Sequence, residues 1–501
     1  MGAGNSGGVP VEREQFEAVA LAGGEPARAL VVGLLERIAV VERDIVRLSG
    51  KIGGLEQIAR RDSGNSSVAP SADPPKSRQQ RRVEARAKAK EQSAREGAAA
   101  RKPGKQDGAV GSGRKLLGEE QVDEFAEYFP VACGGCDREF REDERVPGAR
   151  FGRHQVVELP PIAVLLTEHR THRLRCPDCH AQTAGTLPEE VAGSAFGPGL
   201  AAAVVTLTAR NRVSRRDMSE LVRDLFGIGL SIGSVEAICQ RASLALELPH
   251  EALGAHVLAQ PAINADETGW RTAGEQRTLW TATTERAAIF KVAEDRHRDR
   301  LTALIGEYAG IVCSDRWWAY DHLDPECRQA CWAHLRRDFK FHAEGLAEQK
   351  QFGEQGLALT ERMFKTWHAF GEHRDRERLI LEMKPIQDEF LALLQHAGQK
   401  SKRHRLHRRF ANNLLKLWPA LWTFLATDGV QPTNNAAERS LRGPVISRRL
   451  SQGTRTHDGE RFLERALSAS VTCRLQHRSL YAYMRELLTA HSRGDPLPTL
   501  T

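Results

Sequence analysis

The sequence contains no long apolar run. Among its 501 residues, no stretch approaches the roughly 18 consecutive apolar residues that a membrane-spanning helix needs. The first residues, MGAGNSGGVPVEREQFEA, have no basic start followed by an apolar core, so we expect no secretory signal peptide. Since neither export nor membrane insertion is indicated, we expect a cytoplasmic protein with no membrane partner.

Cysteine is scarce as well, and its spacing is informative. Of the nine cysteines, four form two Cys-x-x-Cys pairs, Cys133 with Cys136 and Cys176 with Cys179. In a chain without a secretion signal, this pattern is typical of metal binding rather than of disulfides. Four thiolates complete a tetrahedral site, so we predict a structural Zn²⁺.

Residues 116–187, which carry these pairs, are predicted to form a zinc-ribbon-like module. Apolar and polar residues alternate in VVELPP and IAVLLTEH, which indicates strands. His172 and His180 lie near the second pair and are alternative ligands. A redox role for one pair is the alternative to zinc.

Large apolar residues are few between residues 61 and 115. Such a segment cannot bury enough surface to offset its ordering entropy, so we predict a flexible linker. The chain has a net charge of +7, and the thirteen basic and five acidic residues between Ala72 and Lys115 account for that excess. This concentrated charge indicates a contact with a polyanion such as DNA; a solvated spacer is the alternative.

Residues 1–60 are predicted to contain a helix with one apolar seam. The seam residues follow one another in steps of three and four, which is typical of a coiled coil. They are Val31, Leu34, Ile38, Val41, Ile45, Leu48, Ile52 and Leu55. We expect Gly53 and Gly54 to weaken the last turn. The seam favours a homo-oligomer, and the alternative is a helix packed on its own chain.

The remaining chain completes a multidomain α+β protein. In the helical region 188–255, Ser231 is expected to cap the second of two helices, which form either a helix-turn-helix or a simple packed pair. The runs PAINAD, TLWTATT, AAIFKVA and GIVCSD indicate strands of an α/β core within residues 256–345. Residues 346–425 are predicted to be a helical insertion, and residues 426–501 complete the core with helices.

Two acidic residues follow predicted strands. Asp266 ends the run PAINA and Asp315 ends the run GIVCS, so a rigid sheet presents both carboxylates. Glu267, Asp321 and Asp324 are alternative ligands, and Glu267 is expected to point to the side of its strand opposite to Asp266.

A third acid, Glu438, lies in QPTNNAAERSLRGPVISRR. Thr433 is suited to cap a helix on which Glu438 shares a face with amides. The neighbours predicted to contact DNA are Asn434, Asn435, Arg439 and Arg442. A carboxylate among amides and guanidinium groups suits a site that holds a metal ion and grips phosphates. The alternative is a capped helix with a Glu438–Arg442 ion pair.

Four segments, ADETGW, SDRWWAY, CWAHLRRDF and PTNNAAERSLRGPVISRRLSQGTRT, closely resemble transposases of the insertion sequence 66 family. The resemblance also covers the N-terminal helix, the module around CPDCH and the segment ending FGIGLSIGSV, in the family's order. It implies a ribonuclease-H-like catalytic core with an Asp-Asp-Glu triad, which falls on Asp266, Asp315 and Glu438. The family often has Asp where this chain has Thr433, which we interpret as an exchange of one cap for another.

The triad predicts a site for Mg²⁺ (or Mn²⁺) that cleaves the 3′ end of an insertion sequence and transfers it into target DNA. His334 and Arg337 share a helix face and are predicted to approach this site or a phosphate, while core packing of Trp332 and Leu335 explains that helix equally well. The basic stretch Lys400–Arg409 is predicted to contact the DNA backbone.

The resemblance implies DNA as partner, through the terminal inverted repeats and the target. It also implies accessory proteins encoded by the same element and a bacterial cytoplasmic location, at the nucleoid when DNA is bound. Two alternatives remain. One is a metal-dependent nuclease or resolvase of the same fold without strand transfer, and the other is a non-catalytic zinc DNA-binding regulator.

Overall fold

The computed structural model describes residues 18, 22–59, 61, 82–83, 86, 115–146, 152–159, 162–345, 347–400, 405–451 and 453–501. Most of the predicted linker 61–115, and residues 401–404 of the predicted basic contact, lie outside this set. Among the described helices, none is both long enough and apolar enough to cross a membrane.

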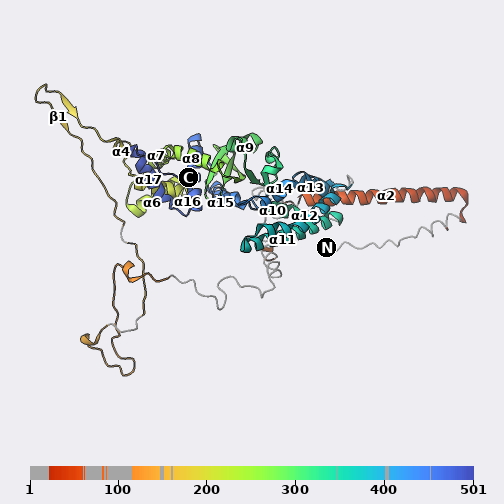
Figure 1. Cartoon of the computed structure of the whole chain (residues 1–501), viewed down its shortest axis with the longest axis horizontal. Coiled ribbons are helices and arrows are strands. Elements are labelled where there is room, and N and C mark those ends of the chain that lie inside the picture. Colours follow the sequence, from red (N-terminus) through yellow and green to blue (C-terminus); the bar gives the residue numbers. More distant parts are fainter. Residues whose placement is uncertain are drawn as a thin grey trace. The chain divides into compact units, whose positions relative to one another are not determined.

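A five-stranded mixed sheet forms the centre of the larger part of the chain (Figure 1). Its strands are β3 (Ala262–Thr272), β4 (Glu275–Thr283), β5 (Ala288–Ala293), β6 (Ile311–Ser314) and β7 (Arg328–Ala330), in the order β5-β4-β3-β6-β7. The first three strands are antiparallel, whereas β6 pairs in parallel with β3, and β7 with β6. All four predicted strands are therefore confirmed. The three-residue β7 was not expected, because its sequence RQA has no apolar pattern.

Strand β3 runs six residues beyond Asp266, so the expectation that Asp266 ends a strand is wrong. Strand β3 extends past the end of the short β6 and continues to pair with β4 as far as Thr272, which lies opposite Glu275. Ala273 and Gly274 close this hairpin with positive φ, the conformation that a tight two-residue turn requires. Asp266 thus lies at the point where β3 loses its parallel neighbour rather than at the end of its strand.

Helix α16 (His457–Leu475) covers the β5 edge of the sheet. Every second amide of β5 donates to a side chain on α16, and these side chains are four residues apart, on one helix face. The donor–acceptor pairs are Val292 with Glu464 (2.6 Å), Phe290 with Ser468 (3.0 Å) and Ala288 with Thr472 (3.1 Å). An edge that would otherwise offer unpaired amides is thereby closed.

Helix α14 (Trp418–Ala426) closes the opposite edge, at β7. The Thr423 hydroxyl donates to the Arg328 carbonyl at 2.6 Å, and the Phe424 amide donates to Oε1 of the Gln329 side chain at 2.8 Å. Both edge strands of the sheet therefore have helical partners.

The predicted helical insertion is present as helices between two parts of the core. After α10 (Trp332–Ala343) come α11 (Ala347–His373), α12 (Arg376–Gly398), α13 (Arg405–Lys416) and then α14. Figure 1 shows α10 to α13 lying together. Their core is aromatic: Trp332 packs on Phe390 and Trp422, and Phe339 on Phe390.

The remaining helices precede, interrupt or follow the strands of the sheet in the sequence. They are α4 (Glu189–Ala192), α5 (Pro198–Ala209), α6 (Arg215–Phe226), α7 (Ile232–Ala245), α8 (Glu247–Leu258), α9 (Arg298–Ile305), α15 (Asn435–Ser451) and α17 (Leu480–Arg493). Helix α16 contacts α5, α7, α8 and α17, while α15 packs on β3 and β4. The predicted Ser231 cap is confirmed, since its hydroxyl accepts from the Ser234 amide at 3.0 Å.

The predicted N-terminal helix is α2 (Gly24–Ala59), and it continues through Gly53 and Gly54. Its apolar seam is exposed: Leu34 is 44% accessible, Ile45 57% and Leu55 67%. Such a stripe on a 36-residue helix lacks a covering surface within the described part of the chain.

The predicted zinc module has little regular structure. It contains two short 3-10 helices, Glu119–Gln121 and Glu142–Glu144, and the antiparallel pair β1 (Arg173–Arg175) and β2 (Gln182–Ala184). The strands expected in VVELPP and IAVLLTEH are absent from described residues 156–159 and 162–169. Their apolar side chains are largely exposed, as the 95% accessibility of Leu165 illustrates, so alternation alone was a misleading signal.

Replacing Ser468 by Ala tests the closure of the β5 edge. The change leaves the buried Phe290 amide without an acceptor, which should lower the free energy of unfolding by about 1–3 kcal/mol. Ser451→Ala is the matched control, because among the described residues the exposed Ser451 hydroxyl bonds to the Ser447 carbonyl of its own helix and to no other group. Denaturant unfolding measures both variants; equal effects would contradict a special role for Ser468.

Candidate active site

The parallel strands align the two predicted aspartates. In the β3–β6 register, Ala262 pairs with Ile311 and Asn264 with Cys313. Asp266 and Asp315 each lie two residues further along, so they stand opposite each other. Ser314 pairs with Ala330 on β7, which places Cys331 beside Asp315 in the same row. One level of the sheet therefore carries two carboxylates and a thiol.

A buried arginine fixes the loop that carries Asp315. Arg328 is fully buried, and its guanidinium donates to the Asp315 carbonyl at 2.6 Å and to the Tyr320 carbonyl at 3.1 Å. The Asp315 carboxylate itself accepts the Trp317 amide at 2.8 Å. Sequence patterns did not identify Arg328 as part of the site, because its role consists of long-range contacts.

Asp266 lies within a concentration of negative charge. Burial raises the pKa of its carboxyl well above the usual value, and the charges of Glu267, Asp315 and Glu438 raise it further. A cation bound among these groups would relieve that repulsion.

The other nearby acids have partners of their own. Glu267 is bound by Arg296 and accepts the Tyr320 hydroxyl at 2.8 Å. Asp321 lies 3.5 Å from the Arg328 guanidinium, and Asp324 accepts the Glu326 amide at the start of a short 3-10 helix. Asp266 therefore remains the available acid on β3. Tyr320 lies in the segment that follows Asp315, and its hydrogen bond to Glu267 holds it in the core.

Asn434 fixes the helix that carries Glu438. Its side-chain amide donates to the Ala265 carbonyl at 2.7 Å, next to Asp266, and its main-chain amide donates to Cys331 Sγ at 3.2 Å. Glu438 lies in the first turn of α15, where its amide bonds to the Asn434 carbonyl at 3.2 Å. Asn434 is only 1% exposed and its amide is used within the chain; DNA contact by Asn434 or Asn435 stays a prediction.

The predicted pair on α10 reaches the same carboxylate. His334 Nδ1 and an Arg337 guanidinium nitrogen each lie 3.5 Å from Glu438 Oε1. Burial lowers the pKa of His334, and the charge of Arg337 lowers it further. The alternative role of that helix is also present, since Trp332 and Leu335 are fully buried.

The donor atoms suit a hard divalent cation. The carboxylates of Asp266, Asp315 and Glu438 interact electrostatically within one cluster. Oxygen-only donors of this kind are the ligands that Mg²⁺ and Mn²⁺ prefer. The donor chemistry of these residues therefore suits the metal that an Asp-Asp-Glu site would hold, although among the described residues the ligand atoms that lie within 4.8 Å of one another are those of Cys331, His334 and Glu438.

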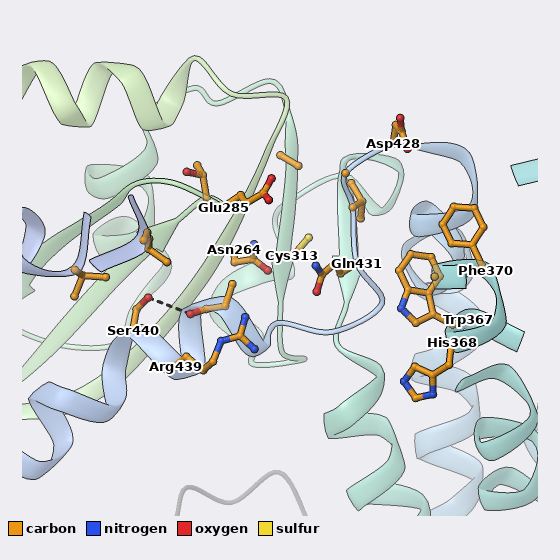
Figure 2. A pocket seen from close by; sticks show the side chains of 18 of the residues that line it. Asn264, Glu285, Cys313, Trp367, His368, Phe370, Asp428, Gln431, Arg439 and Ser440 are labelled. Atoms are coloured by element: carbon orange, nitrogen blue, oxygen red, sulfur yellow. Dashed lines mark hydrogen bonds between the residues drawn. The ribbon is translucent and has the colours of Figure 1, made fainter. Parts of the chain in front are cut away.

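A cavity of about 1110 Å³ lies on the same face of β3 as Asp266. Its wall includes Asn264, two residues before Asp266, and Arg439, which follows Glu438 on α15. Figure 2 shows Trp367, His368 and Phe370 of α11 lining the side opposite Asn264 and Arg439. The cavity thus lies between the sheet and the helical insertion.

Guanidinium groups line much of this cavity. They belong to Arg374, Arg376, Arg439, Arg442 and Arg474. Within the described part of the chain, Arg376 pairs with Asp428 at 2.6 Å, whereas Arg439 and Arg442 have no ion pair. Burial lowers the pKa of Arg474, as do the charges of Arg210 and Arg212. The predicted Glu438–Arg442 pair is therefore absent, and an anion would find several unneutralised cations here.

The two cysteine pairs have the same local backbone. Cys133 O accepts the Asp137 amide at 2.9 Å, and Cys176 O accepts the His180 amide at 3.0 Å. Asp137 and His180, which directly follow the second cysteine of each pair, both have a positive φ, of 56° and 57°. Amides within each turn bond to the first sulfur and lower the pKa of Cys133 and Cys176. Each turn by itself is shaped to present two thiolates.

A sequence profile described as "Transposase IS66 family" matches residues 193–461, more than half of the 501 residues. The matched segment contains all three acids and excludes both cysteine pairs. The chain is also similar to "Uncharacterized protein y4hP" of Sinorhizobium fredii, with 24% identity over 378 residues. That match covers 67% of this chain and 66% of the relative, so the chain spans just under two-thirds of the relative's length.

Asp266 and Glu267 should respond oppositely to neutralisation. In metal-free protein at neutral pH, Asp266→Asn should raise the free energy of unfolding by about 1 kcal/mol, because it removes a destabilised charge. Burial and the charge of Asp315 raise the pKa of Glu267 as well, but Glu267→Gln should lower the free energy of unfolding by about 1.5–3 kcal/mol, because Arg296 loses the charged partner that two of its nitrogens bind.

The raised pKa of Asp266 sets the pH dependence of this difference. A carboxyl whose pKa is raised by folding destabilises the folded state once it ionises. The gain from Asp266→Asn should therefore shrink as the pH falls toward 3.8, the usual pKa of the group. Denaturant unfolding with a chelator present checks this; destabilisation by both substitutions would contradict it.

Proposed function

The chain belongs to the IS66 transposase family, and on that premise we propose that it is a metal-dependent enzyme that cleaves the 3′ ends of an insertion sequence and joins them to target DNA. The observation that supports this proposal is the β3–β6 register, which brings Asp266 and Asp315 alongside each other, with Glu438 close enough for its charge to raise the pKa of Asp266. The order of the sheet strands and the helices around them support a ribonuclease-H-like core.

In this proposal the chain positions three carboxylates. Two come from adjacent parallel strands, and Asn434 holds the helix of the third against β3. A Mg²⁺ or Mn²⁺ ion held by Asp266, Asp315 and Glu438 would supply Lewis-acid activation of the attacking oxygen and stabilisation of the charge on the departing 3′ oxygen. Arg328 keeps the Asp315 loop rigid, which limits the reorganisation that the site needs before reaction.

We propose that the cavity arginines grip DNA phosphates beside the carboxylates. Arg439 and Arg442, predicted from the sequence, are joined there by Arg374 and Arg474. One guanidinium group can donate two parallel hydrogen bonds to the oxygens of a phosphate, and this contact does not depend on the base sequence. Asn435 and Arg337 remain proposed contacts at the edge of the same site.

We also propose that the four cysteines bind a structural Zn²⁺. The matching turns and the lowered pKa values of Cys133 and Cys176 support thiolate ligation. Metal analysis of the purified protein should find bound zinc, and the double variant Cys176→Ser, Cys179→Ser should lose it. An unchanged zinc content in the variant would exclude the assignment.

Self-association through α2 is part of the proposal. Its exposed seam supports a coiled coil between copies of the chain. Ile38→Asp with Ile45→Asp should lower the mass measured by sedimentation, and an unchanged mass would contradict it. Accessory proteins of the same element remain proposed partners.

Two readings remain as alternatives. A nuclease or resolvase of the same fold would cut DNA ends but produce no joined product. A non-catalytic zinc regulator would bind ends and do neither.

Replacing each acid by alanine tests the function. Asp266→Ala, Asp315→Ala and Glu438→Ala should each reduce end cleavage and strand transfer by at least about 100- to 1000-fold, because the charge that stabilises the transition state is lost. Binding to element ends should persist. Cleavage and joining are scored separately on labelled DNA with Mg²⁺.

The matched control is Asp324→Asn, which removes an exposed carboxylate outside the cluster and should keep activity. Strand transfer by all three alanine variants would overturn the proposed site. Cleavage without joining by the unmodified protein would favour the nuclease.

The cavity arginines have a separate test. Arg442→Gln and Arg474→Gln should each weaken DNA binding and reduce the slope of log K against log salt by about 1, the value for one lost phosphate contact. Arg378→Gln is the control, because Arg378 is already paired with Glu382 at 2.7 Å on α12. Titrations at several salt concentrations measure the slope; no difference from the control would place the DNA elsewhere.

A further inference from the structure

A second set of potential metal ligands overlaps the acid cluster. One atom each of Cys331, His334 and Glu438 lies within 4.8 Å of the other two. Cys331 follows β7, His334 lies three residues later in the first turn of α10, and Glu438 lies in the first turn of α15. Three elements thus bring sulfur, nitrogen and oxygen together.

His334 presents a buried nitrogen to this cluster. Its Nδ1 atom is buried and has no hydrogen-bond partner among the described residues, although Glu438 Oε1 is 3.5 Å away. A buried nitrogen left in this way costs free energy that a bound cation would recover. Burial raises the pKa of the neighbouring Cys331 thiol to about 11, and the Asn434 amide, which donates to its sulfur at 3.2 Å, opposes part of that rise.

We propose that Cys331, His334 and Glu438 form a Zn²⁺ site that regulates the enzyme by competing with Mg²⁺ for Glu438. Sulfur and imidazole nitrogen are donors that Zn²⁺ prefers and Mg²⁺ avoids. A Zn²⁺ ion held by all three groups removes Glu438 from the oxygen-only set. The regulatory part rests on the proposed transposase function, whereas the binding site does not.

The charges around the cluster act in opposite directions. Arg337 lies 3.5 Å from the same Glu438 oxygen and repels a cation. Asp315 and Asp338 act on His334 from the sheet and from α10, and their negative charges favour a cation. Metal affinity should therefore rise when Arg337 is neutralised, which a purely structural role of the three ligands does not predict.

Cobalt titration of the full chain, without DNA or Mg²⁺, tests the site directly. Co²⁺ bound to a thiolate gives a near-ultraviolet charge-transfer band. Cys331→Ser should lose the part of this band that belongs to the cluster, whereas Cys327→Ser, at an exposed cysteine, should keep it. The two cysteine pairs contribute equally in both variants.

Two further variants make the result independent of Cys331. His334→Gln should weaken Co²⁺ affinity by about 10- to 100-fold, and Arg337→Gln should strengthen it. Thermal unfolding confirms that each variant is folded. Equal bands in Cys331→Ser and Cys327→Ser, or unchanged affinity in His334→Gln, would overturn the site.

The regulatory claim has its own measurement. Added Zn²⁺ should inhibit Mg²⁺-dependent end cleavage. The His334→Gln variant should need a Zn²⁺ concentration about tenfold higher for the same fractional inhibition. Equal inhibition of both proteins would overturn regulation through this site. If the protein cleaves no DNA at all, the proposed function fails, while the cobalt titration still decides whether the metal site exists.

Discussion

The hydrogen bond from the Asn434 side chain to the Ala265 carbonyl, 2.7 Å long, joins parts of the chain that are 169 residues apart. Asp266 follows Ala265 directly, and Glu438 lies one helical turn after Asn434. The same residue donates its main-chain amide to Cys331, at the end of β7. The buried residue Asn434 therefore sets the distance between Asp266 and Glu438, and it also connects both acids to Cys331 at the end of β7.

The site is assembled against its own electrostatics. Burial and like charges raise the pKa of both Asp266 and Glu267, and the contacts of Arg296 and Tyr320 offset this only for Glu267. A rigid scaffold is needed to hold such groups together, and the closed sheet edges and the buried Arg328 supply it. The free energy for this comes from packing elsewhere, above all from the aromatic core around Trp332.

Local patterns predicted much of this fold, and long-range contacts account for what they missed. The four strand runs, the Ser231 cap and the helix of Glu438 depend on neighbouring residues, so the sequence reveals them. Strand β7 has no apolar signature, and the extension of β3 depends on its pairing with β4. The acids were identified individually, but their register, the role of Arg328 and the arginine-lined cavity exist only in the folded chain.

The covering of both sheet edges limits how copies of this chain can associate. Helix α16 occupies the amides of β5, and α14 binds the main chain of β7. A second chain therefore cannot extend the sheet by adding a strand, a common route to both dimers and aggregates. Copies that meet at this part of the chain must instead use side-chain contacts, which can be formed and released without unfolding the sheet.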